Sequence, residues 1–186
     1  MNELNQLPTS LPIPIDDGLC DHLLGMPLPD ISLLSTGNEL VNLSSLKGIT
    51  VFYCYPMTGR PDIPHPEGWE DIPGARGCTP QSCSFRDHHN ELKRLNASVF
   101  GVSVQSSDYQ KEAKNRLHLP YSLLSDAEYK LANALSLPIL TVENMPLLKR
   151  VTFIAENGVI TKVFYPVFPP DKNIDEVLES LTKSYL

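Results

Sequence analysis

Two of the four cysteines, Cys78 and Cys83, lie in the segment 77–87, where their spacing could support thiol chemistry. Thr79 and Pro80 follow Cys78 directly, and a threonine followed by a proline is typical of the start of a helix. We therefore expect Cys78 at a helix N-terminus. Unpaired backbone amides and the positive end of the helix dipole stabilise a thiolate there. The thiolate is the nucleophilic form of cysteine, so the segment predicts a reactive thiol.

Cys83 stands five residues after Cys78. In a continuous helix this spacing gives a rise of about 7.5 Å and a rotation of about 140°, which places the two Cα atoms roughly 8–9 Å apart. A disulfide requires a Cα separation of about 4.4–6.8 Å. A bond between these cysteines would therefore require the first turns of the helix to unwind. Such a pair suits a cycle in which one cysteine reacts first and the other joins it after local unfolding.

The remaining thiols and the histidines after Cys83 give weaker signals. His88 and His89 extend the pattern to Cys-x4-Cys-x4-His-His, but adjacent histidines on a helix point about 100° apart and cannot easily face one metal. Structural zinc sites also use closer cysteine pairs. The sequence thus predicts no metal site. Cys54, inside an apolar run, is predicted to be a buried hydrophobic residue, and Cys20 receives no role.

The segment before Cys78 must carry it from the end of a strand. Residues 49–55 form a continuous apolar and aromatic run, which is typical of a strand buried on both faces. Residues 59–77 follow, with four prolines and the only tryptophan, Trp69. A structureless segment of this length inside a compact domain is usually functional. It is either a surface loop packed by its own tryptophan or a wall of the site.

The rest of the chain alternates between strand and helix patterns, which predicts an α/β fold with a central mixed β-sheet flanked by helices. Residues 1–24 are expected to form an extended N-terminal arm, and residues 25–186 a single domain. Hairpins are predicted at 30–43 and at 151–165, the second around the strong turn signal Asn157–Gly158. Further strands are predicted at 98–104 and 121–124, and helices at 79–95, 108–117 with Ser107 as N-cap, 127–135 and 171–181.

Composition excludes several classes of partner. The 186 residues carry 15 basic and 22 acidic side chains, a net charge of −7, so no basic surface is expected for nucleic acid or an anionic membrane. No lysine or arginine precedes Lys47, which does not fit a secretory signal or a transit peptide. We therefore expect a cytoplasmic protein whose cysteines serve catalysis or redox exchange. A monomer and a homodimer both remain open.

Residues 52–87 resemble the peroxiredoxins, and most of all the branch of the bacterioferritin comigratory protein, or peroxiredoxin Q. The resemblance covers roughly residues 25–183. It rests on Tyr55–Pro56, on Gly-Cys-Thr-Pro-Gln-Ser-Cys-Ser-Phe-Arg-Asp at 77–87, and on the strand start at 149–154. It implies a thioredoxin-like fold and a peroxidase that reduces hydrogen peroxide or organic hydroperoxides without a cofactor. It also implies thioredoxin or a glutaredoxin system as the reductant.

The same resemblance implies roles for three residues. Cys78 matches the peroxidatic cysteine, which a peroxide oxidises to a sulfenic acid. Cys83 matches the resolving cysteine, which condenses with that acid to form a disulfide. Arg150 matches the active-site arginine of the family. Its fixed charge would hold the thiolate and orient the peroxide oxygens.

The chain departs from the family pattern before the cysteine. The family has a threonine three residues before its peroxidatic cysteine, and this chain has Ala75 there. Pro56 and Thr58, at the end of the predicted strand, are the nearest residues of the required types. We expect the insert 59–77 to bulge outward and to return the Thr58 hydroxyl to the Cys78 thiolate.

Two other functions fit the same residues. One is a thioredoxin-like disulfide oxidoreductase that exchanges with protein thiols. The other is a non-enzymatic redox-sensing interaction module whose insert presents Trp69 to a partner. Consumption of peroxide with a thioredoxin system distinguishes the peroxidase from both.

Overall fold

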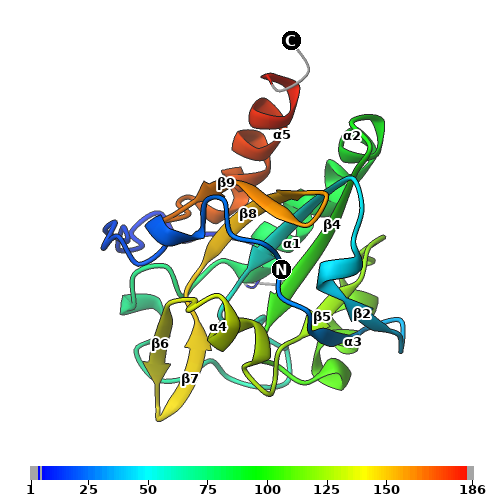
Figure 1. Ribbon diagram of the computed structural model, residues 1–186. Helices are drawn as coiled ribbons and strands as arrows, with labels where there is room; N and C mark the ends of the chain where they lie inside the picture. Colours follow the sequence, from blue (N-terminus) through cyan, green and yellow to red (C-terminus); the bar gives the residue numbers. More distant parts are fainter. Residues whose placement is uncertain (1–3, 5, 184–186) are drawn as a thin grey trace.

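The computed structural model describes residue 4 and residues 6–183 of the chain. At its centre is a mixed sheet of seven strands in the order β2-β1-β5-β4-β3-β8-β9 (Figure 1). The middle strands pair in parallel, and the strands outside them pair antiparallel. The strands are β1 (Ser32–Ser35), β2 (Leu40–Asn42), β3 (Ile49–Cys54), β4 (Ala97–Ser103), β5 (Leu123–Ser125), β8 (Val151–Glu156) and β9 (Val159–Phe164). The predicted α/β class with a central mixed sheet is confirmed.

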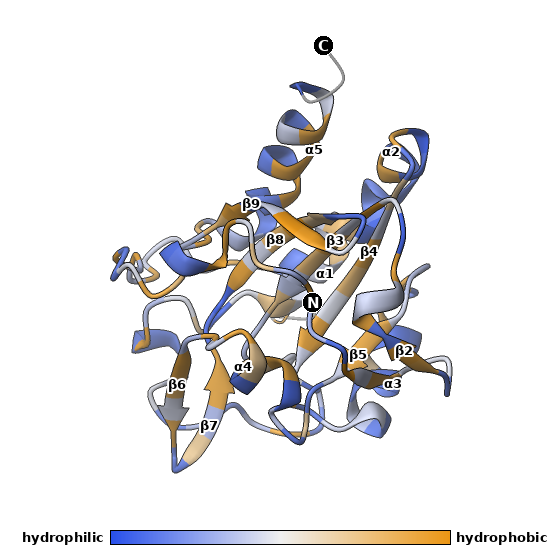
Figure 2. Cartoon of the chain, viewed as in Figure 1, coloured by the Kyte–Doolittle hydropathy of each residue, from blue (hydrophilic) through white to orange (hydrophobic). Residues whose placement is uncertain are grey.

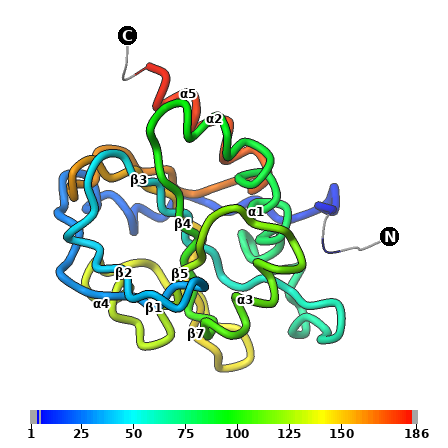
Figure 3. Tube along the Cα trace, turned by 90° about the vertical axis from the view of Figure 1, so that its right-hand side faces the viewer, coloured from blue at the N-terminus to red at the C-terminus, as the bar shows by residue number. Residues whose placement is uncertain are grey.

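Helices cover both faces of this sheet. Phe85 of α1, Leu92 of α2 and Ile174 of α5 pack in one core cluster with Tyr53 of β3. Leu131 of α4 packs in the other cluster. In Figure 3, α1 and α4 lie on opposite sides of the strands. The helices are α1 (Cys78–Asp87), α2 (His89–Arg94), α3 (Ser107–Arg116), α4 (Lys130–Ala134) and α5 (Asn173–Lys183).

The predicted buried strand and closing helix keep the patterns that identified them. After Ile49, every residue of β3 is buried, so its continuous apolar run reflects two covered faces. In α5, Ile174, Val177 and Leu181 are buried and recur at helical spacing. Figure 2 shows hydrophobic and hydrophilic residues on the same helix, as an amphipathic helix requires.

Helix boundaries differ from the prediction where capping decides them. The predicted helix 79–95 is two helices, because His88 leaves helical geometry with φ −100° and ψ 11°. The N-cap of α3 is Ser106 and not Ser107, since the Ser106 hydroxyl accepts from the Tyr109 amide. The Asp126 carboxylate accepts from the first amides of α4, which delays the start of that helix.

A two-stranded hairpin, β6 (Ile139–Val142) and β7 (Met145–Leu148), was not predicted. Its turn residues Glu143 and Asn144 have φ of 47° and 65°, which is the left-handed pair that a two-residue hairpin turn needs. The hairpin was missed because glutamate at the first turn position is not a turn signal and because Pro146, inside β7, usually argues against a strand. The hairpin packs on Trp69 through Val142 and Leu147.

The N-terminal segment lies against the domain. Cys20 and Leu23 are buried in the core cluster that also contains Phe52, and Asp21–Leu23 form a 3-10 turn. Near the end of the arm, the Asp17 carboxylate forms an ion pair with Lys149 of the domain. The boundary at residue 24 stays a prediction. In the described part of the chain, no helix has the length and apolar character needed to cross a membrane.

Candidate active site

Cys78 is the first residue of α1, and its side chain is 3% exposed. Gly77 turns the chain into the helix with φ 111°, a conformation that favours glycine. A Cβ atom at Gly77 would also collide with the Pro170 ring, so glycine permits this close approach. Thr79 and Pro80, the pair that predicted the helix start, lie inside the first turn. The expected position of Cys78 at the N-terminus of the helix is the one in the structure.

Arg150 meets the sulfur of Cys78 from the start of β8. Its Nη2 donates to Cys78 Sγ at 3.2 Å, and the arginine is only 4% exposed. The same nitrogen lies 3.1 Å from the carbonyl oxygens of Gly74 and Ala75 and 3.3 Å from that of Arg76. The Cys78 thiol donates to the Ala75 carbonyl at 3.6 Å. A buried cation this close to the sulfur stabilises negative charge on it strongly, because little water screens the pair.

The insert 59–77 has both of the features that were predicted as alternatives, a loop packed by its own tryptophan and a wall of the site. Trp69 is buried and packs against Ala75, so the segment is held by its own tryptophan. His65 stacks on Trp69 with ring centroids 6.0 Å apart. The end of the same insert supplies the carbonyl groups that surround the Arg150 guanidinium. It is therefore both a packed loop and a wall around the arginine.

A buried chain of polar side chains extends from Arg150 to α5, and sequence reasoning missed it. Arg150 Nη1 donates to Gln81 Oε1 at 2.5 Å, and Gln81 Nε2 donates to Asn173 Oδ1 at 3.0 Å. The Thr152 hydroxyl donates to the same Asn173 oxygen at 2.7 Å. Gln81, Asn173 and Thr152 are fully buried. Gln81 is one helical turn after Cys78, a signal that could have been read, whereas Asn173 carries no sequence signal.

Pro56 and Thr58 are buried beyond the end of β3. The Thr58 amide and hydroxyl donate to Gln105 Oε1 at 2.9 and 3.2 Å, and the Tyr109 hydroxyl donates to the Thr58 carbonyl. The hydrogen bonds described for Thr58 thus go to Gln105 and Tyr109, and those of Cys78 go elsewhere. The expected return of the Thr58 hydroxyl to the thiolate stays a prediction.

Cys83 is half-buried in α1, so both cysteines of the pair lie on one intact helix. Burial raises the pKa of the Cys83 thiol above its ordinary value, and nearby Arg86 partly opposes the shift. The preceding residue, Ser82, is held from two sides. The Tyr53 hydroxyl donates to its Oγ at 3.1 Å, and the Tyr121 hydroxyl donates to its carbonyl at 2.8 Å. Unwinding this part of α1 must break both bonds.

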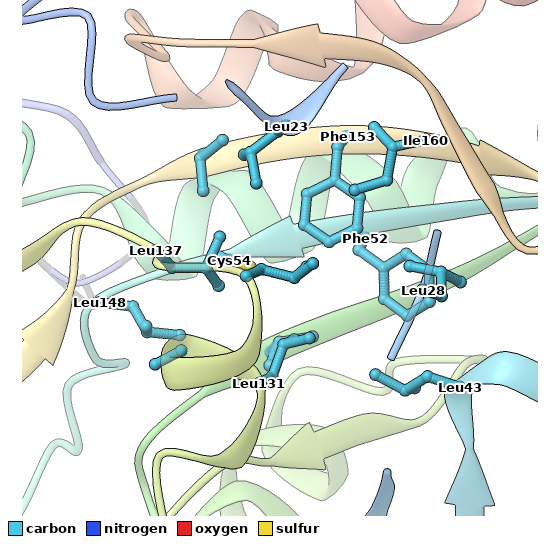
Figure 4. Packing of buried hydrophobic residues seen from close by; sticks show 14 of the residues in the cluster. Leu23, Leu28, Leu43, Phe52, Cys54, Leu131, Leu137, Leu148, Phe153 and Ile160 are labelled. Carbon is cyan, nitrogen blue, oxygen red and sulfur yellow. The ribbon is translucent and has the colours of Figure 1, made fainter. Parts of the chain in front are cut away.

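The other two cysteines lie away from this site. Cys54 is fully buried among apolar side chains such as Leu137 and Phe52 (Figure 4), and burial raises its pKa. Cys20 is 3% exposed, and burial with three neighbouring aspartates raises its pKa to about 12. Among residues 4 and 6–183, no three His, Cys, Asp or Glu side chains are grouped to hold a metal ion. His88 Nδ1 is instead 2.9 Å from the Ser84 carbonyl oxygen.

Residues 23–178 match the redoxin family. The chloroplastic peroxiredoxin Q of Suaeda salsa is 34% identical over 155 residues, which are 82% of this chain and 64% of that protein. The chloroplastic peroxiredoxin Q of Sedum lineare is 33% identical over 159 residues, 84% of this chain and 76% of that protein. Peroxiredoxin Bcp of Bacillus subtilis is 36% identical over 112 residues, 60% of this chain and 62% of that protein. The chain thus spans less than two thirds of the length of some of these relatives.

Solved structures share the fold. Peroxidoxin BcpB of Mycobacterium tuberculosis superimposes with a TM-score of 0.70 at 24% identity, covering 86% of this chain and 96% of that one. A PrxQ mutant from Xylella fastidiosa superimposes with a TM-score of 0.72 at 21% identity, covering 88% and 97%. The predicted thioredoxin-like fold is therefore confirmed.

Proposed function

The chain belongs to the redoxin family, in its peroxiredoxin Q and Bcp branch, and from this premise we propose that it is a thiol-dependent peroxidase. One observation carries the proposal: the Arg150 guanidinium donates to the sulfur of Cys78 at 3.2 Å, at the N-terminus of α1. A cation and a helix N-terminus both stabilise the thiolate that must attack the peroxide. Cys54 instead lies in an apolar cluster, where burial and, to a smaller extent, Asp126 raise its pKa.

In the proposed first step, the Cys78 thiolate attacks the terminal oxygen of a hydroperoxide. A sulfur–oxygen bond forms and the oxygen–oxygen bond breaks, so the sulfur is oxidised to a sulfenic acid and the peroxide is reduced. The leaving alkoxide or hydroxide takes up a proton and departs as an alcohol or water. Arg150 stabilises the charge that moves from sulfur to the leaving oxygen. Thr58 and Pro56 are proposed to contribute to the peroxide pocket, as the resemblance to the family implies.

In the proposed second step, Cys83 attacks the Cys78 sulfenic acid, releases water and forms an intramolecular disulfide. Both cysteines lie in α1, so its first turns must unwind. The bonds of Ser82 to Tyr53 and Tyr121 break in this movement. Exposure of Cys83 then removes the burial that raises the pKa of its thiol. Thioredoxin or a glutaredoxin system would supply the two electrons that restore both thiols.

Two further points concern the substrate and the location of the protein. Structures of the Xanthomonas campestris bacterioferritin comigratory protein concern alkyl peroxide reduction, which supports organic hydroperoxides as substrates here. We propose a cytoplasmic location, because the four cysteines are few and form no disulfide, as is usual in a reducing compartment. The names of the plant relatives place those proteins in chloroplasts. Cell fractionation tests the location, and recovery of the protein in a plastid fraction would contradict the cytoplasmic proposal.

The proposal is tested with Cys78→Ser and Cys83→Ser variants. We expect the parent to consume peroxide with a thioredoxin system and Cys78→Ser to lose turnover completely. Peptide mass mapping after one equivalent of peroxide should find a Cys78–Cys83 link in the parent and an unresolved Cys78 sulfenic acid in Cys83→Ser. Disulfide exchange without peroxide consumption would instead identify a disulfide oxidoreductase. A link from Cys78 to Cys20 or Cys54 would overturn the role of Cys83.

A further inference from the structure

A cavity of about 230 Å³ adjoins the candidate active site on the side of Arg150. Arg150 and Gly74 line it, and the Gly74 carbonyl is one of the groups that accept from Arg150 Nη2. The cavity and the Cys78 sulfur therefore share one neighbour, Arg150. Most of the remaining wall is apolar, including Ile72, Leu140, Pro166 and Val167.

The N-terminal arm completes this cavity with Pro14 and Ile15. Asp17 fastens the arm in place: its carboxylate accepts from Lys149 Nζ at 2.6 Å and from the Tyr165 hydroxyl at 2.8 Å. These two bonds lower the pKa of Asp17 to about 2, so the carboxylate is ionised at neutral pH. Lys149 and Tyr165 themselves line the cavity, so the arm is fixed at its rim.

We propose that this cavity binds the organic group of an uncharged apolar hydroperoxide and that Ile15 determines this specificity. The inference rests on the proposed peroxidase function and deepens it. The arm thus becomes part of the substrate site, in addition to its packing role. Hydrogen peroxide, which has no organic group, would not use the cavity.

The lining of the cavity argues for an apolar and uncharged occupant. Lys149 is the only cation besides Arg150 in the wall, and its charge is already paired with Asp17. Ile15 lines the cavity and yet is 86% exposed, so an apolar group seated there would remove its side chain from water. Arg150 would keep a donor for the peroxide oxygens, because its Nε has no hydrogen-bond partner among the described residues, whereas Nη1 donates to Gln81 and Nη2 to backbone carbonyls and the Cys78 sulfur.

The reaction balances with the organic group held in this place. The Cys78 thiolate takes the terminal oxygen of the hydroperoxide and becomes a sulfenic acid. The second oxygen stays on the organic group, takes up a proton and leaves as an alcohol. The alcohol is the product that the cavity releases, so it should bind weakly at the same place.

The chain supplies a matched pair of variants for the test, Ile15→Asn and Ile13→Asn. Both isoleucines are on the arm and exposed, at 86% and 68%, but only Ile15 lines the cavity. With cumene hydroperoxide, we expect Ile15→Asn to lower kcat/KM about tenfold, mainly through KM, which is the lower end of the effect of a lost apolar contact in a pocket. Hydrogen peroxide turnover should not change. Ile13→Asn should match the parent with both peroxides, and Ile15→Leu should restore the parent value.

A second measurement does not depend on turnover. Binding of the product alcohol, 2-phenyl-2-propanol, is followed by NMR line broadening on parent, Ile15→Asn and Ile13→Asn proteins. Loss of binding in Ile15→Asn alone supports the proposal. Equal ratios of the two peroxide activities in all three proteins would overturn it while leaving the peroxidase intact. A parent protein that consumes neither peroxide would overturn the proposed function and this inference with it.

Discussion

Cys78 and Cys20 are equally buried, at 3% exposure each, but their electrostatic surroundings are opposite. An arginine nitrogen lies 3.2 Å from the Cys78 sulfur. Burial raises the pKa of Cys20 to about 12, with smaller contributions in the same direction from aspartates 16, 17 and 21. Burial alone therefore does not distinguish the two thiols. The charges beside them differ in sign, and an adjacent cation favours the thiolate whereas adjacent carboxylates disfavour it.

Two adjacent cations show how this contrast is built. Lys149 donates to the Asp17 carboxylate of the arm, and Asp17 is one of the aspartates that raise the pKa of Cys20. Arg150 points to the insert, where uncharged carbonyl groups hold it. Carbonyl groups satisfy hydrogen-bond donors without cancelling the positive charge. The Arg150 charge therefore acts on the Cys78 sulfur, whereas the Asp17 carboxylate compensates the charge of Lys149.

The strongest way to break the contrast is to remove the charge beside Cys78. Arg150→Gln should lower kcat/KM for hydrogen peroxide by about 10²–10³-fold, the range for loss of a donor to developing charge. The rate of Cys78 alkylation by iodoacetamide should fall as well. Arg94→Gln, at the exposed end of α2, is the matched control and should keep the parent values. Parent-like activity in Arg150→Gln would show that the helix N-terminus alone activates the thiol.

A finer change leaves the charge in place and loosens its support. Asn173→Ala removes the acceptor shared by Gln81 and Thr152, so Gln81 loses the bond that fixes it against Arg150. We expect kcat/KM to fall about tenfold, because small displacements of a positioned group are costly. Asn173→Asp keeps an acceptor at this place and should recover part of the loss.

A double-mutant cycle separates positioning from a general structural effect. If Asn173 acts through Arg150, adding Asn173→Ala to Arg150→Gln should cost little more activity. A full additional tenfold loss in the double variant would contradict the positioning role. Thermal unfolding of all four proteins shows whether the free energy of unfolding changes in parallel.

The sequence predicts the parts of the site that are local or that carry a charge. Cys78 follows from a helix-start pattern, and Arg150 from a strand start that resembles the family. The Gln81–Asn173 link could not be predicted, because it joins residues 92 positions apart through a hydrogen bond. Such a contact depends on how α5 packs against α1, which no local pattern encodes.

The elements of the fold also fall into those that a local sequence pattern predicts and those that it does not. The buried strand β3 and the amphipathic helix α5 follow from hydrophobic periodicity. The break at His88 and the cap at Ser106 follow from single side-chain and backbone conformations, to which periodicity is blind. The β6–β7 hairpin was missed because its turn uses Glu143 in a left-handed conformation. Its stability comes from packing on Trp69, a contact distant in sequence.

The smallest expected effect concerns the insert that surrounds Arg150. His65 Nδ1 lies 3.3 Å from Arg76 Nη1, so it accepts a hydrogen bond as a neutral ring. Burial, with a smaller contribution from Arg76, lowers the pKa of His65, while Glu70 opposes the shift. Below the ordinary value of 6.5, the unfolded insert therefore binds more protons than the folded one. The stability of the insert is present at neutral pH and falls as the pH decreases through this region.

Hydrogen exchange of residues 59–77 at pH 7.5 and 5.5, corrected for the intrinsic exchange rates, measures this effect. We expect a few-fold loss of protection at pH 5.5 in the parent, in keeping with a modest shift of one histidine. His65→Gln, whose side-chain oxygen can still accept from Arg76, should remove most of the difference. The amides of β3 are the internal control, because they lie in the core and not in the insert. An equal loss of protection in β3 would mean that acid loosens the whole domain, and the surroundings of Cys78 would then be no more sensitive to pH than those of Cys20.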